Sequence, residues 1–252
     1  MQVLVALALE AEFAVWRRQR RFRPVPADRR DSAVAMHEAE IDGATVRVAL
    51  TGVGAARAQA LRAVLERGRP DLCLAGGLAG ALSPRQRRGT VIVAREVLGS
   101  AGDRRYASDG RLVAEAEACG ARAIGLLASA DRILVTAAEK RALASRADVV
   151  DMESFTILEA AAALGVPAVA VRAISDGADE DLPVDFNRTI GADGRMSLVR
   201  MAGQMARHPA RLGRLVEFGR GSAAAAAALG GFLDRYVGRL AAAAREAEAL
   251  AG

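Results

Sequence analysis

The sequence has few of the side chains that most often build metal sites and nucleophilic triads. Its only two histidines, His37 and His208, lie far apart, so a histidine-based metal site or a Ser-His-Asp triad has little to build on. Cys73 and Cys119 have neither CxxC spacing nor a neighbouring histidine, and we expect reduced thiols in or near the core. Lysine occurs once, at Lys140. Acid–base chemistry in this chain is therefore expected to depend on carboxylates.

Aromatic residues and long apolar runs are also scarce. Aromatic side chains make up 4% of the 252 residues, and small apolar residues fill the interior instead, which suits helices packed closely on a parallel sheet in one domain. No apolar run reaches the roughly 18 residues of a membrane span. The apolar start, residues 1–9, has no basic region and is followed at once by Glu10 and Glu12, unlike a secretory signal. We therefore expect a cytoplasmic protein.

The net charge of +5 raises nucleic acid as a partner. The basic residues are almost all arginines, however, and they are scattered without an RNP, zinc-finger or helix-turn-helix signature. A solvated arginine-rich surface is the favoured interpretation, so no nucleic-acid partner is predicted. Binding through the clusters at 17–23 and 195–220 remains the alternative, and it predicts an affinity that falls steeply with salt.

Strands alternate with helices along residues 1–194. "MQVLVALALEAEF" indicates a buried strand and then a helix that begins near its two glutamates, and Asp42-Gly43 between two alternating runs is a strong hairpin signal. A helix is expected over 153–164, followed by the strand "PAVAVRAIS". This order predicts an α/β fold, a three-layer α/β/α sandwich with a central mixed, mostly parallel sheet.

From residue 195 onward the pattern is helical and rich in alanine. One or two helices are expected, with Gly230-Gly231 as a weak point because glycine is a poor helix former. We interpret residues 195–252 as a C-terminal helical extension of the same domain, packed on the core or on a second subunit. A basic amphipathic helix at a membrane surface is the alternative.

Four acids follow predicted strands, at the edge where ligands bind in open α/β sheets. Glu10 and Glu12 follow the first strand, Glu153 follows "ADVVDM", and Asp176 follows "PAVAVRAIS". Each later acid has a local alternative: an anion at a helix start for Glu153, and turn chemistry in Ser-Asp-Gly for Asp176. Convergence of several acids on one edge favours a functional site. Carboxylates without histidines suit cleavage of a glycosidic or N-ribosyl bond, where one group stabilises a cationic sugar and another protonates the leaving group.

The segment 149–179, "VVDMESFTILEAAAALGVPAVAVRAISDGAD", resembles the signature of the purine nucleoside phosphorylase and methylthioadenosine/S-adenosylhomocysteine nucleosidase superfamily. "ALEAEF", "TGVGAARA", "GGLAGAL" and "SADRIL" occur in the order of that family. The resemblance covers about residues 1–180, and it implies that residues 1–194 form a nucleoside phosphorylase-like catalytic domain.

Carried over residue by residue, the resemblance implies a role for each acid. Glu153 would bind the ribose hydroxyls, with Met152 packed against the sugar. Asp176, positioned by Ser175, would protonate or hydrogen-bond purine N7, and Glu12 would orient the attacking water. Such an aspartate must hold its proton near neutral pH, and we expect burial near other carboxylates to arrange this.

The sequence departs from the family at two places. Leu78 and Ala75 stand where phosphorylases offer a serine and an arginine to phosphate, which favours water over phosphate as the nucleophile. Ile133 replaces an aromatic residue that stacks on adenine, so adenine recognition is expected through the backbone near Ile133 and Leu134. The predicted substrate-binding residues are completed by Thr51 and Gly77, with Leu78 beside them.

A narrower similarity, to the hopanoid-biosynthesis-associated phosphorylase-like branch, rests on "SADRIL…TAAEK", "DMES" and the basic segment 192–218. It implies loss of adenine from an adenosyl-hopane-like lipid, held in an apolar 5′ pocket by a protein whose basic tail touches the membrane surface. The family implies a homodimer. No metal or organic cofactor is expected, and phosphate is a co-substrate only in the alternative of a phosphorylase. A second alternative, motivated by Leu78 and Ile133, is a nucleoside-binding module without turnover.

Overall fold

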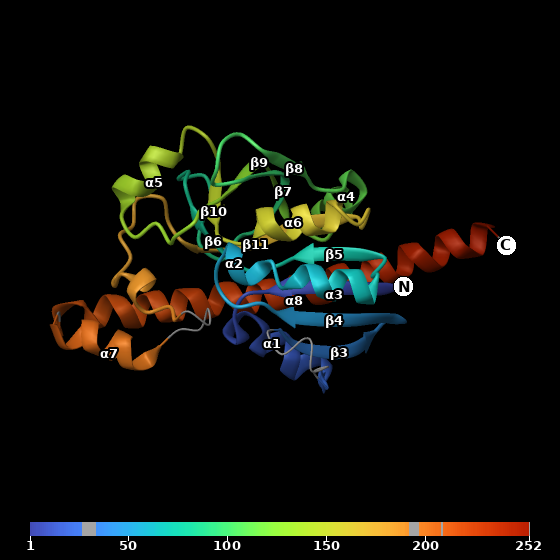
Figure 1. Cartoon of the computed structure of the whole chain (residues 1–252), viewed down its shortest axis with the longest axis horizontal. Coiled ribbons are helices and arrows are strands. Elements are labelled where there is room, and N and C mark those ends of the chain that lie inside the picture. Colours follow the sequence, from blue (N-terminus) through green and yellow to red (C-terminus); the bar gives the residue numbers. More distant parts are fainter. Residues whose placement is uncertain (27–33, 192–196, 208, 252) are drawn as a thin grey trace.

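The computed structural model describes residues 1–26, 34–191, 197–207 and 209–251 (Figure 1). Its centre is one sheet, which contains eleven strands within these ranges. The strands are β1 (Gln2–Leu7), β2 (Arg23–Val25), β3 (Ala35–Ile41), β4 (Ala44–Leu50), β5 (Leu72–Ala75), β6 (Leu78–Ala81), β7 (Val91–Leu98), β8 (Arg105–Ala107), β9 (Arg122–Ser129), β10 (Val149–Asp151) and β11 (Ala168–Asp176). The helices are α1 (Glu10–Arg20), α2 (Ala55–Ala58), α3 (Leu61–Gly68), α4 (Gly110–Ala118), α5 (Ala137–Leu143), α6 (Ser154–Ala162), α7 (Leu198–Arg207) and α8 (Leu212–Ala251), with single 3-10 turns at Phe186–Arg188 and Pro209–Arg211.

The sheet is mixed, and its strands lie in the order β2-β3-β4-β1-β5-β11-β6-β10-β9-β7-β8, with β7 also paired to β11. β1, β5 and β11 run parallel, so their carboxyl ends lie at one edge. β10, by contrast, is antiparallel to β6. Glu12 and Asp176 therefore reach the edge as predicted, whereas Glu153 arrives from a strand of the opposite direction.

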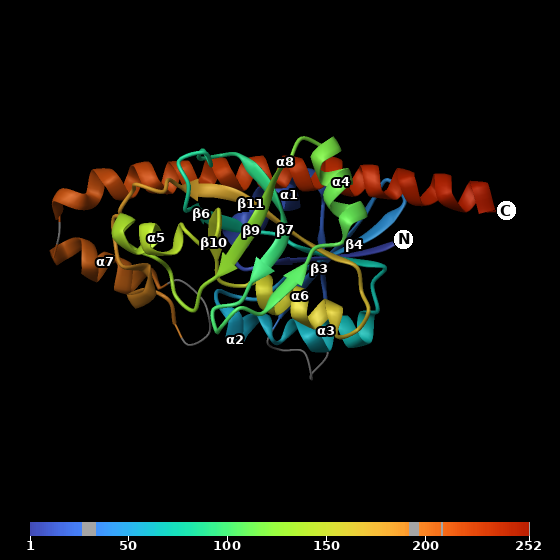
Figure 2. The ribbon, with the colours of Figure 1, turned by 90° about the horizontal axis from the view of Figure 1, so that it is seen from above.

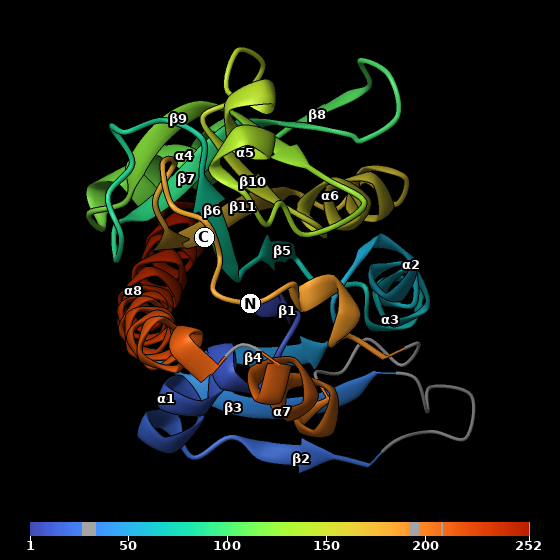
Figure 3. The ribbon, with the colours of Figure 1, turned by 90° about the vertical axis from the view of Figure 1, so that its left-hand side faces the viewer.

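Helices pack on both faces of the sheet, as Figures 2 and 3 show. One face is covered by α1, α4 and α8, with Trp16 and Phe232 in its core. The other is covered by α3 and α6, with Leu61 and Ile157 in its core. The predicted mixed α/β fold with a central sheet and flanking helices is confirmed.

α8 is one continuous helix of 40 residues, about 60 Å long at 1.5 Å per residue. The prediction of a weak point at Gly230-Gly231 is wrong, because tertiary contacts use the small residue there. A Cβ on Gly230 would lie 3.4 Å from both the backbone nitrogen and the Cβ of Trp16, so glycine lets α1 and α8 approach closely. Four residues on, Asp234 accepts hydrogen bonds from Trp16 Nε1 (3.0 Å) and Arg20 Nε (2.6 Å).

Most local predictions are confirmed. β3 and β4 form the expected hairpin, and Asp42 (φ 49°) and Gly43 (φ 83°) adopt the left-handed conformations that a two-residue turn requires. Cys73 and Cys119 are free thiols. The short strands β2 and β8 were not predicted, and residues 55–68 form two short helices, α2 and α3. No helix in the described part of the chain is long and apolar enough to cross a membrane.

Candidate active site

Glu12 lies in the first turn of α1, directly after β1, and its carboxylate is held by backbone. Its Oε2 accepts hydrogen bonds from the amides of Ala8 (2.9 Å) and Leu9 (3.0 Å), and Oε1 accepts one from the amide of Leu78 (3.1 Å). Burial raises the pKa of Glu12, and these hydrogen bonds together with the charge of Arg172 partly oppose the rise. The result is a fixed, buried carboxylate at the glycine-rich turn before β6, suited to accept a proton.

Glu153 occupies the N-cap position of α6, but its side chain makes no capping hydrogen bond. It crosses to the glycine-rich turn after β4, where Oε1 accepts a hydrogen bond from the amide of Gly54 (2.7 Å). The capping alternative for Glu153 is therefore wrong. Burial, with the nearby Asp151 carboxylate, raises the pKa of Glu153 to about 7, although the charge of Arg172 opposes the rise.

Asp176 ends β11 where that strand's register with β6 shifts. The irregularity brings two consecutive side chains, Ser175 and Asp176, to the same cavity. Ser175 Oγ donates to Asp176 Oδ1 at 2.6 Å, as expected of a positioning residue. Gly80 faces them across the strand pair, and a Cβ there would lie 3.0 Å from Asp176 Oδ2. Among the described residues, no backbone amide donates to this carboxylate, so it is not explained by Ser-Asp-Gly turn chemistry.

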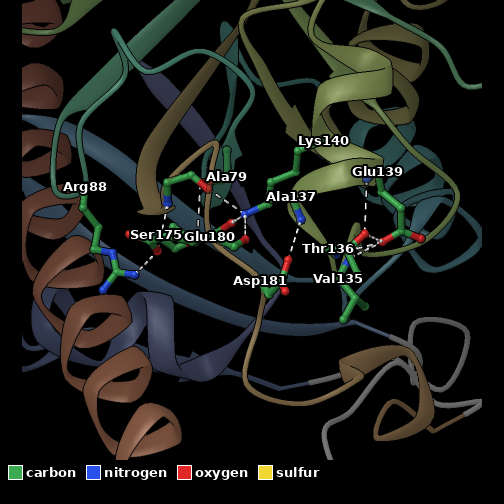
Figure 4. Close-up of polar contacts among 12 residues, drawn as sticks. Ala79, Arg88, Val135, Thr136, Ala137, Glu139, Lys140, Ser175, Glu180 and Asp181 are labelled. Atoms are coloured by element: carbon green, nitrogen blue, oxygen red, sulfur yellow. Dashed lines mark hydrogen bonds and ion pairs between the residues drawn. The ribbon is translucent and has the colours of Figure 1, made fainter.

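The second oxygen of Asp176 contacts a cation. Lys140 Nζ donates to Oδ2 at 2.5 Å, and the side chains of Lys140 and Asp176 are 1% and 9% exposed. The sequence predicted other carboxylates around Asp176. That prediction is wrong for the closest contact of Asp176, which is the Lys140 ammonium. Lys140 comes from α5, as Figure 4 shows, and that helix is fixed by a capping box between Thr136 and Glu139. Sequence reasoning missed Lys140, although its being the only lysine was a usable signal.

A second buried cation, Arg172, lies in the middle of β11. Its Nη2 contacts Asp151 Oδ2 at 2.5 Å and Ser154 Oγ at 2.9 Å, and Nη1 donates to the carbonyl of Gly76. Asp151 in turn accepts a hydrogen bond from Ser129 Oγ at 2.5 Å. This network was also missed, and its signal was an arginine within nine consecutive buried residues of β11.

Gly77 leaves room for this guanidinium. Its φ of +147° is rarely adopted by residues with side chains, and a Cβ would lie 1.9 Å from Arg172 Nη1. The same Cβ would lie 3.3 Å from Glu12 Oε1, so Arg172 and Glu12 approach each other at this glycine. Gly77 therefore shapes the site through its lack of a side chain.

Glu12, Glu153, Asp176 and Lys140 line a cavity of about 530 Å³. Eight predicted site residues line it: Glu12, Leu78, Ile133, Leu134, Met152, Glu153, Ser175 and Asp176. Two others, Thr51 and Gly77, are not among its described lining residues, and the Thr51 hydroxyl bonds to backbone carbonyls instead. Glu10 also lies outside, in an ion pair with Arg17.

The far wall of the cavity is apolar. It is built by the segment after β11 together with α7 and α8, through Leu182, Phe186, Ile190, Met201, Leu215 and Phe218. Ile133 packs against the same apolar cluster. Both the amide and the carbonyl of Ile133 bond to the side chain of Asn187, at 2.8 and 2.9 Å. The backbone of Leu134, in contrast, has no hydrogen-bond partner among the described residues, so its amide and carbonyl are available to bind a ligand.

The arrangement joins two chemistries. One end carries two tethered carboxylates and an aspartate backed by a lysine, which suits proton transfer and stabilisation of a cationic sugar. The other end offers apolar surface and an unused backbone amide and carbonyl, which suits a flat heterocycle with an apolar substituent.

Comparison with known proteins identifies relatives of this chain. Residues 2–202 match the model of the phosphorylase superfamily. A 5′-methylthioadenosine/S-adenosylhomocysteine nucleosidase of Anoxybacillus flavithermus is 27% identical over 216 residues, covering 75% of this chain and 90% of the relative.

Solved structures share the fold. A nucleosidase of the same name from Neisseria meningitidis, in complex with methylthio-immucillin-A, has a TM-score of 0.70 and 24% identity, covering 94% of this chain and 98% of its own. The futalosine hydrolase of Helicobacter pylori has a TM-score of 0.72 and 17% identity, with 94% and 97% covered. The match over residues 2–202 spans most of the chain, so the chain belongs to the phosphorylase superfamily and is an enzyme.

Proposed function

We propose that this enzyme is a nucleosidase that cleaves the N-ribosyl bond of an adenine nucleoside with water as nucleophile. The proposal rests on one observation. Glu12, Glu153 and Asp176 line one end of the same cavity, although they come from three separate segments. The similarity to the 5′-methylthioadenosine/S-adenosylhomocysteine nucleosidase of Anoxybacillus flavithermus supports this proposal.

Each acid has a role that its surroundings support. Glu153 accepts hydrogen bonds from the ribose hydroxyls, and Met152 packs on the sugar. Asp176, held by Ser175, gives a hydrogen to purine N7 so that the base leaves neutral. Glu12 orients the water and takes its proton as the oxocarbenium-like ribose is attacked.

The choice of water over phosphate rests on the groups that surround Glu12. Leu78, which replaces a family serine, offers only its amide, and Glu12 occupies that amide. The guanidinium of Arg172 is 1% exposed and already bonded to Asp151, Ser154 and Gly76. Among the described residues around Glu12, a phosphate dianion would therefore lack a free cationic partner. A phosphate-dependent phosphorylase and a nucleoside-binding module remain the alternatives.

The base and the 5′ substituent are assigned to different groups that line the cavity. The free amide and carbonyl of Leu134 suit the edge of adenine, with Ile133 beside the base. The apolar wall of α7 and α8 suits a large hydrocarbon 5′ substituent, such as that of an adenosyl-hopane-like lipid. The similarity of residues 192–218 to the hopanoid-associated branch supports the same substrate.

Delivery of a lipid would require contact with a membrane surface. α7 lies beside the start of α8 (Figure 1). These two helices expose Val199 (82%), Leu212 (55%) and Val216 (46%), and the arginines at 200 and 211 are their neighbours in sequence. Apolar side chains flanked by arginines suit an anionic bilayer surface. We propose that this end of a homodimeric protein touches the membrane while it works.

The test is release of free adenine from adenosine, methylthioadenosine and an adenosyl-lipid, each with and without phosphate. Release that is independent of phosphate, and fastest for the lipid, is the expected outcome. Phosphate-dependent release would instead establish a phosphorylase. Ligand-dependent thermal stabilisation without release from any substrate would favour the binding module.

A further inference from the structure

The ammonium of Lys140 has an acceptor for each of its three hydrogens. Nζ donates to Asp176 Oδ2 (2.5 Å), to the carbonyl of Gly177 (2.7 Å) and to the carbonyl of Glu180 (2.9 Å). A lysine ammonium has three donors and no acceptor, so its hydrogen-bonding capacity is completely used. Both Lys140 and Asp176 line the cavity described above.

The surroundings hold this ammonium in place. The turn that supplies its carbonyls is closed by a hydrogen bond from the Gly177 amide to Glu180 Oε2 (3.2 Å), and Glu180 also pairs with Arg88. On the other side, the amide of Ala137 at the start of α5 donates to Asp181 Oδ1 at 2.8 Å. Figure 4 shows these contacts from α5 to the turn. Lys140 is therefore a preorganised partner of Asp176.

This geometry creates a requirement for the departing base. The two oxygens of Asp176 accept hydrogen bonds from Ser175 and from Lys140, and a carboxylate that only accepts has no hydrogen to give. A purine that leaves as a neutral base must receive one. Within the described residues, the Lys140 ammonium is the only charged proton donor that contacts Asp176.

We infer that Lys140 is the positioning residue that supplies the proton which Asp176 passes to the leaving purine. The inference rests on the proposed N-ribosyl cleavage and deepens it. As the bond from C1′ to the purine breaks, its electron pair moves onto the base, and N7 takes a proton from Asp176. Asp176 takes a proton from Nζ, leaving a neutral amine. Water bonds to C1′ and gives its proton to Glu12, and after release solvent returns a proton to Lys140 and removes one from Glu12.

That residue 140 is a lysine and not an arginine supports a role in proton transfer over a purely structural role. The chain has 35 lysines and arginines, and Lys140 is the single lysine among them. An arginine pairs with carboxylates at least as well, but its guanidinium does not give up a proton in proteins, whereas a lysine ammonium does. A buried ion pair is also a weak source of stability, because apolar residues of similar volume often replace it at no cost.

The experiment compares Lys140→Arg and Lys140→Met with wild type and with Arg141→Met, which removes the neighbouring cation on α5. Two substrates are followed from low to high pH: the adenine nucleoside that wild type cleaves best, and a p-nitrophenyl riboside. Nitrophenolate leaves without a proton, so its release does not need the relay. The ratio of the two rates within one variant cancels any loss of folded protein.

Lys140→Arg keeps the charge but supplies no proton, so we expect adenine release to fall about 10²- to 10⁴-fold while nitrophenol release stays close to wild type. Lys140→Met leaves a buried, unpaired Asp176 that must carry its own proton. We therefore expect adenine release to survive at low pH, with the alkaline limb of the profile moved to lower pH. Arg141→Met should match wild type.

Equal losses for both substrates in Lys140→Arg, or an unchanged alkaline limb in Lys140→Met, would overturn the relay and leave the proposed function standing. A wild type that releases no adenine from any nucleoside would overturn both. The relay is supported only if the release rate falls for the adenine nucleoside, whose leaving group needs a proton, and not for the p-nitrophenyl riboside.

Discussion

In the proposed reaction, leaving-group chemistry depends on Asp176. Replacing it with asparagine keeps its shape but removes the transferable proton, so we expect adenine release to fall about 10²- to 10⁴-fold. The change also leaves the buried Lys140 ammonium without its carboxylate, so the free energy of unfolding should fall as well. Steady-state adenine release and urea denaturation measure the two effects separately.

Asp179→Asn is the matched control, since Asp179 is an exposed aspartate three residues further on. It should leave both measurements unchanged. Full adenine release by Asp176→Asn would contradict the role of Asp176.

In the proposed reaction, Glu153 should make the rate sensitive to pH on the acid side. Its pKa is raised to about 7 by burial and by Asp151, so the carboxylate is lost as pH falls through that value rather than near 4.5. The pKa of Glu12 is raised too, and both groups act as hydrogen-bond or proton acceptors only when ionised. We expect kcat/KM for the adenine nucleoside to fall about tenfold for each pH unit below this pKa.

A profile of kcat/KM from pH 5 to pH 9 checks this prediction. Glu153→Gln should lower the rate and flatten the part of the acid limb that belongs to Glu153. A wild-type limb near pH 4.5 would contradict the assignment of a buried, high-pKa acid.

At the scale of single elements, the turn before β6 is the most constrained. Gly77→Ala would place a Cβ 1.9 Å from Arg172 Nη1 at a φ of +147°. Because the guanidinium is held by Asp151 and Ser154, it cannot move without loss of a buried pair. We expect destabilisation of about 3 kcal/mol or more, together with loss of activity. Gly110→Ala, where a Cβ meets nothing within 4 Å, is the control and should be neutral in denaturation.

Gly230 and Gly231 of α8 are adjacent glycines with different surroundings, so substitutions at the two positions can be compared. Gly230 faces Trp16 of α1, so Gly230→Leu should separate the two helices and cost about 1 to 3 kcal/mol. A Cβ on Gly231 meets only Arg235 Nη1 at 3.6 Å, so Gly231→Ala should stabilise by about 0.5 to 1 kcal/mol. Denaturation of both variants measures the difference, and equal effects would contradict this packing of α1 on α8.

Elements differ in how far the sequence predicts them. The β3–β4 hairpin and β11 were predicted because turn chemistry and apolar runs are local signals. β2 and β8 have three residues each, too few to show a period. The division between α2 and α3, and the continuity of α8 at Gly230, depend on neighbours that the local sequence does not contain.

At the scale of the whole molecule, α7 and α8 line part of the cavity, and this end of the molecule also exposes apolar side chains to solvent. If that end touches membranes, the double change Val199→Ser and Val216→Ser should weaken binding to vesicles that contain anionic lipid. The loss should be about tenfold or more, since burial of one such side chain contributes roughly 1.5 kcal/mol. Vesicle co-sedimentation at low and high salt measures it.

Leu164→Ser is the control for the vesicle experiment, because Leu164 is an exposed apolar residue just after α6, away from α7. It should bind like wild type. Binding that is identical for all three proteins, or absent in wild type, would contradict membrane contact through this end.

The sequence by itself determined the alternation of strands and helices, the hairpin, the superfamily, and three acids, Glu12, Glu153 and Asp176, at the ends of predicted segments. These features depend on periodicity, turn chemistry and motifs, which are local. Only the tertiary structure decided which groups touch those acids. Lys140 meets Asp176 across 36 residues, and Arg172 meets Gly76 across 96, through the packing of α5 and β6 against β11. The apolar wall likewise forms only when α7 and α8 fold back over the sheet edge, because burial selects contacts by shape and not by distance along the chain.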